Sequence, residues 1–218
     1  MLKIVFSVVL FIGFSVCHAS WTCSSFLINK DGYIATAAHC VAQDNGTRAK
    51  LIRVVYQGQL EKATIIAVNL DEDVAIIKID KTNTPHGSLA LWADSGDKVY
   101  NLGYPIPNMR GRDLKISGGT IYKRYPLGAY LTSAGACSGN SGGPTVNELG
   151  NIVGILVAGL GEDPCYPTTY VVNINYLIRM AVENDVHITI NDNTEIVPVA
   201  KKDLLIRYID KVLFLIGE

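Results

Sequence analysis

Three short segments carry residue types that together suit nucleophilic catalysis. Ser141 stands in the glycine-rich stretch GACSGNSGGP, residues 135–144. His39 follows an apolar run within TAAHC, and Asp73 opens the apolar run DVAIIKI. Serine is a weak nucleophile unless a base takes its proton and a third group holds that base. The three residues are therefore a candidate nucleophile, base and orienting acid.

The glycines around Ser141 indicate a shaped site. Glycine tolerates positive φ angles and close approach of other groups, and each glycine costs conformational entropy. An acyl-transfer site also needs donors directed at the oxygen that becomes negative. We predict that the backbone amides of Gly139 and Ser141 point toward one such position, an oxyanion hole. Gly142 and Gly143 would let the chain turn sharply away from it.

His39 is the histidine best placed to act as the base. Of the four histidines, His18 lies in the N-terminal leader, His86 in a loop with proline and glycine, and His187 in the tail. His39 directly follows a predicted strand and lies among small residues that allow close packing. An acid at the start of a buried strand is costly unless it is paired, so an imidazole N–H is a natural partner for Asp73.

The segments that must position these residues have the pattern of short β-strands. From about residue 21 to residue 176, apolar, β-branched runs such as SSFLI, ATIIAV and TTYVVNI alternate with turn residues. Asn-Lys-Asp-Gly at residues 29–32 is a hairpin signal. No helical stretch separates the runs, which favours a β-sandwich or a β-barrel. We therefore predict an all-β fold.

Two helices are expected after the strands. Between residues 173 and 184 the apolar residues recur at helical spacing, which predicts a helix. In the last residues, PVAKKDLLIRYIDKVLFLIGE, the pattern predicts a second, amphipathic helix. Four apolar residues share one face of this tail helix: Leu205, Ile209, Val212 and Ile216. Such a helix ordinarily docks on its own domain, and contact with a membrane surface or a partner is the alternative.

The N-terminus has the pattern of a secretory signal peptide. Lys3 supplies a positive charge, residues 4–16 form an apolar run, and small residues in Cys17-His18-Ala19 fit a cleavage site after Ala19. The run is shorter than the roughly 20 apolar residues of a membrane span. We therefore expect a secreted or periplasmic protein, with an uncleaved anchor helix as the alternative.

The composition disfavours several kinds of partner. The chain has 218 residues, and 49% of them are hydrophobic, enough for one sizeable core or two small coupled cores. A formal net charge of −1 gives no reason to expect nucleic acid. The sequence has no CxxC pair, HExxH motif or acidic EF-hand loop. We therefore expect no metal site and no cofactor.

The cysteine count is consistent with disulfides in an exported protein. The chain has five cysteines, and loss of Cys17 with the leader leaves Cys23, Cys40, Cys137 and Cys165. An even set in an exported chain favours disulfides. Four cysteines allow three connectivities, and their spacing alone does not choose among them.

Taken together and in this order, TAAHC, DVAIIKI and GNSGGP resemble the trypsin/chymotrypsin superfamily of serine endopeptidases, over roughly residues 23–184. Within it, GNSGGP and GDKVYNLGYP look more like the bacterial-type high-temperature-requirement proteases. The resemblance implies two antiparallel β-barrels of chymotrypsin type with the active site between them. The implied organisation is a signal peptide (1–19), a peptidase domain (20–184) with barrels at about 20–90 and 91–173 and a closing helix (174–184), and a C-terminal extension (185–218).

The resemblance also implies a role for each candidate residue. Ser141 corresponds to the nucleophile, His39 to the general base and then acid, and Asp73 to the orienting carboxylate. The amides of Gly139 and Ser141 correspond to the oxyanion hole. Among the three connectivities, the family implies one pairing: Cys23 with Cys40, and Cys137 with Cys165.

A substrate pocket without charge is expected from the same resemblance. Its predicted floor and walls are Gly135, Ala136, Val157, Ala158, Gly159 and Thr168. Such a pocket should favour a neutral, mainly apolar residue before the cleaved bond. The alternative is an added preference for basic residues, from Glu162 and Asp163 on a nearby loop. In the family, a serine at the position of Val157 often hydrogen-bonds the triad acid. Valine cannot donate this bond, so the sequence does not identify the group that supports Asp73 in its place.

Two further features depart from the trypsin-like pattern. Asn140 stands where trypsin-like zymogens have an aspartate that pairs with a newly freed N-terminus, and an amide cannot form that ion pair. We therefore expect no trypsin-type activation. About 19 mature residues precede His39, so the first barrel should lack its opening strand or borrow one from the tail, for which the segment HITI (187–190) is a candidate.

The sequence thus predicts an exported serine endopeptidase that acts on proteins or peptides. One alternative is an esterase-like or narrow processing hydrolase with the same triad. Another is a binding module that kept the fold and lost the chemistry.

Overall fold

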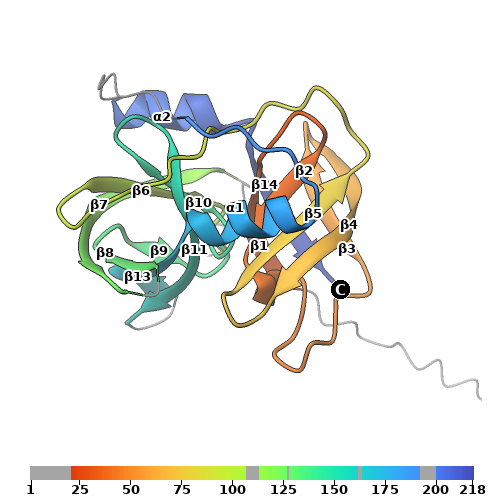
Figure 1. Ribbon diagram of the computed structural model, residues 1–218, viewed down its shortest axis with the longest axis horizontal. Coiled ribbons are helices and arrows are strands. Elements are labelled where there is room, and N and C mark those ends of the chain that lie inside the picture. Colours follow the sequence, from red (N-terminus) through yellow and green to blue (C-terminus); the bar gives the residue numbers. More distant parts are fainter. Residues whose placement is uncertain (1–20, 107–112, 127, 162–163, 192–199) are drawn as a thin grey trace, which may run out of the picture.

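The computed structural model describes residues 21–106, 113–126, 128–161, 164–191 and 200–218. Its strands close into two six-stranded antiparallel barrels that lie side by side (Figure 1). The predicted all-β fold with two antiparallel barrels is therefore confirmed. The predicted signal peptide lies outside the described residues.

The first barrel combines N-terminal strands with one strand from the C-terminal tail. Around the barrel the order is β1, β14, β3, β4, β5 and β2. Their bounds are β1 Trp21–Leu27, β2 Tyr33–Thr36, β3 Ile52–Tyr56, β4 Gln59–Asn69, β5 Val74–Ile79 and β14 Val212–Gly217. In the turn between β1 and β2, the Asn29 side-chain oxygen accepts hydrogen bonds from the amides of Asp31 and Tyr33. This turn sets the register in which Phe26 pairs with Ala35.

The second barrel is formed by consecutive segments in the middle of the chain. Around it the order is β10, β11, β13, β8, β7 and β6. Their bounds are β6 Lys98–Gly103, β7 Lys115–Arg124, β8 Ala129–Thr132, β10 Pro144–Asn147, β11 Ile152–Leu160 and β13 Thr168–Asn173. Two short strands, β9 Ala136–Cys137 and β12 Cys165–Tyr166, pair beside this barrel.

Short helical segments accompany the barrels in the described part of the chain. The 3-10 helix η1 covers Ala38–Cys40, between β2 and β3. The predicted closing helix is confirmed as α1, Ile174–Glu183, and its N-terminus is capped by the Asn173 side chain, which accepts a hydrogen bond from the Asn175 amide. The tail helix α2 covers only Lys201–Tyr208.

The structure corrects the prediction for the tail. The predicted helix extended through Val212 and Ile216, but the chain leaves the helix after Tyr208 and continues as the strand β14. The first barrel does borrow a strand from the tail, and that strand is β14 rather than HITI. Within HITI, only an isolated bridge joins Ile190 to Leu89. Residues 212–217 are therefore part of the first barrel.

The change from helix to strand has a physical cause in the barrel edges. β14 pairs antiparallel with β1 on one side and with β3 on the other, so it satisfies backbone groups that two open edges would leave unpaired (Figure 1). The segment VLFLIG contains the β-branched residues Val212 and Ile216 and the aromatic residue Phe214, which suit a strand. Tertiary hydrogen bonding thus outweighs a helical spacing of apolar residues.

The tail contacts both barrels. While β14 lies in the first barrel, α2 docks on the β10–β11 hairpin of the second, where the Tyr208 hydroxyl donates to Gly150 O at 2.8 Å and the Arg207 guanidinium to Leu149 O at 3.0 Å. Burial raises the pKa of Tyr208 far above its usual value, so the hydroxyl remains a donor. The tail therefore links the two barrels.

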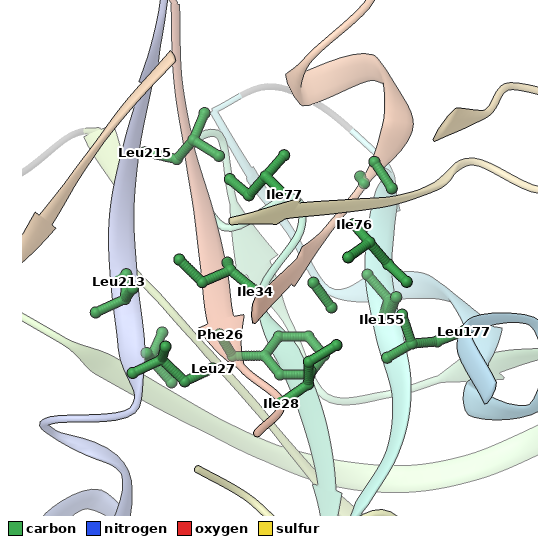
Figure 2. Packing of buried hydrophobic residues seen from close by; sticks show 14 of the residues in the cluster. Phe26, Leu27, Ile28, Ile34, Ile76, Ile77, Ile155, Leu177, Leu213 and Leu215 are labelled. Carbon is green, nitrogen blue, oxygen red and sulfur yellow. The ribbon is translucent and has the colours of Figure 1, made fainter. Parts of the chain in front are cut away.

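The main hydrophobic core lies inside the first barrel and extends to α1. Figure 2 shows Leu213 and Leu215 of β14 packed among side chains of the neighbouring strands, including Phe26 and Ile34. Leu177 of α1 and Ile155 of β11 belong to the same buried cluster. Of the helices described, none is both long and apolar enough to span a membrane.

Candidate active site

The structure brings His39 and Asp73 into direct contact. His39 lies on η1 between the fully buried residues Ala38 and Cys40, so the turn is fixed while the imidazole stays partly exposed. Nδ1 of His39 lies 2.7 Å from Oδ2 of Asp73. The backbone amide of His39 donates to the other carboxylate oxygen, Oδ1, at 2.9 Å. Both oxygens of Asp73 are thus oriented by the same residue.

Asp73 is held by an unusual backbone conformation. Its φ angle is +53°, in the left-handed region that non-glycine residues seldom adopt. The turn before it is fixed by a hydrogen bond from the Asp73 amide to Leu70 O at 3.3 Å and by an ion pair between Glu72 and Arg179 of α1. Strained residues of this kind persist when their surroundings over-determine them, often at functional sites. The helix that follows the second barrel therefore supports the acid of the first barrel.

Ser141 lies just before strand β10 of the second barrel, next to the turn that carries His39. Its carbonyl oxygen accepts a hydrogen bond from the Ser24 amide at 2.8 Å and lies 3.7 Å from Cys40 Sγ. Gly142 has a φ of +83°, and a Cβ there would come within 2.2 Å of Ser24 O. Only glycine therefore allows the serine loop to approach the first barrel this closely.

The hydroxyl of Ser141 contacts the chain at one point in the described structure. Oγ donates to Val157 O at 3.4 Å, a long hydrogen bond. Catalytic hydrogen bonds are often long or poorly aligned without substrate. Among the described residues, no hydrogen bond joins Ser141 Oγ to His39.

The loop leaves two amides for a ligand. Within residues 138–143, the amides of Ser138, Asn140, Gly142 and Gly143 each donate to a backbone carbonyl. Those of Gly139 and Ser141 have no acceptor in the described part of the chain, and Gly139 has a φ of +95°. These are the two amides that the sequence predicted for an oxyanion hole.

A pocket of about 270 Å³ opens beside Ser141. Its lining residues are Ala136, Cys137, Ser138, Ser141, Leu156, Ala158, Gly159 and Tyr166. Of the six residues predicted for the pocket, Ala136, Ala158 and Gly159 line it. Val157 lines a neighbouring cavity instead. Gly135 and Thr168 are not among its lining residues.

Tyr166 is a wall of this pocket that sequence reasoning missed. Its ring lies against Gly159, where an added Cβ would come within 2.1 Å of the ring carbons. Tyr166 also pairs with Ala136 in the small β9–β12 sheet. Its position next to Cys165 was the available signal, because a residue beside that disulfide is fixed close to the serine loop. Among the described residues that line the pocket, none has a charged side chain, and Glu162 and Asp163 lie outside the described residues.

Both disulfides have the pairing that the family resemblance implied. Cys23 is bonded to Cys40, which ties β1 to the turn of His39. Cys137 is bonded to Cys165, which ties the serine loop to a wall of the pocket. Cys23, His39 and Cys40 place potential metal ligands within 4.8 Å of one another. The two sulfurs are joined in the disulfide, so they cannot act as the thiolates that a metal would need.

Asn140, the residue before Ser141, is buried with an unpaired oxygen. Its side chain is 6% exposed, and Oδ1 has no hydrogen-bond partner among the described residues. A Cβ on Gly103 would lie 2.9 Å from this oxygen, so little room surrounds it. A neutral amide is less costly in such a place than a carboxylate would be.

Two antiparallel barrels, with a His–Asp pair on one and a serine in a glycine loop on the other, define the trypsin-like class of peptidase folds. Residues 23–155 match the family described as "Trypsin-like peptidase domain". The chain belongs to this family.

Several curated relatives of this chain are named as bacterial proteases. The probable periplasmic serine endoprotease DegP-like of Chlamydia pneumoniae is 31% identical over 149 residues, which are 63% of this chain and 29% of that protein. The protein of the same name from Pseudomonas fluorescens (strain Pf-5) is 33% identical over 141 residues, 61% of this chain and 28% of that protein. This chain thus spans less than a third of the length of these relatives.

Solved structures have the same fold. The HtrA-type protease AlgW with decapeptide matches with a TM-score of 0.65 at 23% identity, over 75% of this chain and 51% of that chain. The serine endoprotease from Yersinia pestis matches with a TM-score of 0.60 at 27% identity, over 74% of this chain and 56% of that chain.

Proposed function

We propose that this protein is a serine endopeptidase that hydrolyses peptide bonds through an acyl-enzyme intermediate. The observation that carries the proposal is the 2.7 Å contact between His39 Nδ1 and Asp73 Oδ2 beside a serine loop with two available amides. An imidazole held in this way presents Nε2 as the base. Membership of the trypsin-like peptidase family supports the same chemistry.

Each residue of the site has a defined role in the proposed reaction. Oγ of Ser141 bonds to the substrate carbonyl carbon while its proton passes to His39 Nε2. The carboxylate of Asp73 accepts a hydrogen bond from His39 Nδ1–H and stabilises the imidazolium. The proton then passes from Nε2 to the leaving amine as the C–N bond breaks, and water hydrolyses the acyl-enzyme by the same steps. The amides of Gly139 and Ser141 would bind the oxyanion, and loss of one such donor typically costs about 10²–10³ in kcat.

The pocket beside Ser141 supports a preference for a neutral, mainly apolar residue before the cleaved bond. No described residue of its lining has a charged side chain, and Tyr166 narrows the pocket against Gly159. Small to medium apolar side chains fit a pocket of about 270 Å³. Discrimination by apolar shape is modest, roughly 1–3 kcal/mol per methylene.

Activation by a newly freed N-terminus is not part of the proposed mechanism. Asn140 offers no carboxylate to an ammonium group, and the Ser138–Gly139 peptide is already fixed by a hydrogen bond from the Ile106 amide to Ser138 O at 2.8 Å. The loop therefore has a defined arrangement without that ion pair.

We also propose that the protein works in an oxidising compartment outside the cytoplasm. Two disulfides favour a periplasmic or secreted location. The N-terminal signal pattern and the names of the bacterial relatives point the same way.

The test is cleavage of a mixed peptide library by the purified, oxidised protein. We expect cuts after neutral, apolar residues that disappear in Ser141→Ala, and labelling of the wild type but not of this variant by a serine-directed fluorophosphonate. Labelling with cleavage of esters but not of peptides would favour the narrow hydrolase. A folded wild type that neither cuts nor labels would favour the binding module and overturn the proposal.

A further inference from the structure

Ser24, on β1, hydrogen-bonds to the serine loop through both its side chain and its backbone amide. Its side chain is fully buried, and Oγ donates to Gly139 O at 2.9 Å. The same oxygen accepts a hydrogen bond from the Tyr104 amide at 2.9 Å. Its own amide donates to Ser141 O at 2.8 Å, and its carbonyl oxygen accepts from Thr36 Oγ1. One residue of the first barrel thus holds both residues of the candidate oxyanion hole, which belong to the second.

These contacts fix the peptide planes on either side of Gly139. Gly139 has a φ of +95°, and because glycine adopts many backbone conformations, its own preference does not hold it at this angle. The preceding peptide is held through Ser138 O by the Ile106 amide, and the following peptide is held through Gly139 O by Ser24 Oγ. Because a trans peptide is planar, fixing each carbonyl also fixes the N–H on the opposite side. The bond to Ser138 O fixes the plane that carries the Gly139 N–H, whereas the bond from Ser24 Oγ fixes the plane of Gly139 O and the Asn140 N–H, which also donates to Cys137 O at 3.0 Å. Loss of the Ser24 hydroxyl therefore weakens the hold on the second plane and, through ψ of Gly139, on Gly139 itself.

The C-terminal strand holds Ser24 in place. In the β1–β14 ladder Ser24 lies opposite Phe214. Tyr104, whose amide donates to Ser24 Oγ, packs its ring edge-on against Phe214, at 6.0 Å between centroids, and donates its hydroxyl to Val212 O at 3.1 Å. Burial raises the pKa of Tyr104, which keeps this hydroxyl protonated. β14 therefore contacts Ser24 directly through the ladder and indirectly through Tyr104.

We propose that Ser24 is a positioning residue, kept in place by the C-terminal strand, that holds Gly139 and Ser141 by their carbonyl groups and so keeps the backbone of the candidate oxyanion hole in the arrangement that binds the transition-state oxyanion. This inference rests on the proposed peptidase function. In a trypsin-like zymogen, the freed N-terminus supports this loop. Here the buried hydroxyl of Ser24, which is part of the folded barrel, would do so. Ser24 itself does not touch the substrate.

The neighbouring Ser25 provides a matched control. It is also fully buried on β1, but its Oγ donates to Leu213 O at 3.3 Å and makes no hydrogen bond to the described part of the serine loop. Ser25→Ala therefore removes a similar hydroxyl, and a similar contribution to folding, without touching Gly139. The comparison uses the full chain, one peptide amide substrate, and active-site titration with a fluorophosphonate, so that kcat counts only competent molecules.

We expect Ser24→Ala to lower kcat by about tenfold or more with KM within about twofold, because the loss is confined to the transition state. Affinity for a peptide boronic acid, which presents a tetrahedral anion, should fall by the same factor. Ser25→Ala should change each quantity by less than about twofold. An equal kcat in the two variants, or a loss that appears only in KM, would overturn the role of Ser24. Absence of cleavage by the wild type would instead overturn the proposed function.

A second pair keeps the test valid if Ser24→Ala does not fold. Ser24→Thr and Ser24→Val have nearly the same shape and differ in the hydroxyl. We expect the threonine variant to retain most of the wild-type kcat and the valine variant to lose it. Equal kcat values for these two would show that the hydroxyl is not what orients the loop.

Discussion

The role of the tail strand β14 leads to a quantitative prediction for Leu215→Ala. Leu215 is fully buried and lies between Cys23 on β1 and Val54 on β3. Truncation of a buried leucine costs about 2–5 kcal/mol, from lost transfer free energy and the cavity left behind. At about 2–4 °C per kcal/mol for a chain of this size, the Tm should fall by roughly 4–20 °C.

Ile206→Ala in α2 is the matched control. Ile206 belongs to the same tail but is 70% exposed, so its truncation should change the free energy of unfolding by less than about 0.5 kcal/mol. If residues 201–218 formed one amphipathic helix on the surface, the two variants would behave alike.

Urea and thermal unfolding of the oxidised protein, followed by tryptophan fluorescence, measure the difference. Trp21 is a local reporter, because its ring packs against Gly217 at the end of β14, whereas the other tryptophan, Trp92, is 59% exposed. A Tm for Leu215→Ala equal to that of Ile206→Ala would refute the assignment of β14 to the first barrel.

Two further predictions concern the pocket and the residue before the nucleophile. Tyr166→Ala should widen the pocket. The ratio of kcat/KM for a substrate with a large aromatic residue before the cut to that for a substrate with alanine should rise, by a factor equivalent to roughly 1–3 kcal/mol. Kinetics on two such peptides measure this ratio, and an unchanged ratio would mean that Tyr166 does not limit pocket size. Asn140→Asp should place an unpaired carboxylate in a buried site, so its pKa should rise above the unfolded value of about 3.9. The variant should therefore lose stability relative to wild type as the pH rises from about 4 to 7, because the unfolded state ionises more readily; denaturation at several pH values beside Asn140→Ala checks this, and a difference independent of pH would contradict it.

The sequence alone was informative where the chemistry constrains residue type locally. A nucleophile loop that approaches another barrel within contact distance requires glycine, as at Gly142, and the resulting pattern GNSGGP is rare enough to identify. His39 and Asp73 were selected because each is joined to a predicted buried strand, and the structure places them 2.7 Å apart. Their catalytic roles remain predictions that the proposed experiments test.

The sequence was less informative where partners from distant segments decide the outcome. Only part of the predicted pocket lines the cavity beside Ser141, because Tyr166 reaches it through the β9–β12 pair and the Cys137–Cys165 disulfide. The support of Asp73, left open by Val157, comes from the His39 amide. The contact with the His39 amide has no signature in local spacing, and the local signal for Tyr166 is limited to its place beside Cys165.

Local pattern therefore determined the class of fold, the closing helix α1 and the short segments that carry the candidate triad. The tertiary structure decided that the tail divides into a helix and a strand and that β14 completes the first barrel. The physical reason is that apolar residues at helical spacing can also fill a barrel strand. The choice depends on whether open edges, here those of β1 and β3, are available to pair with the backbone.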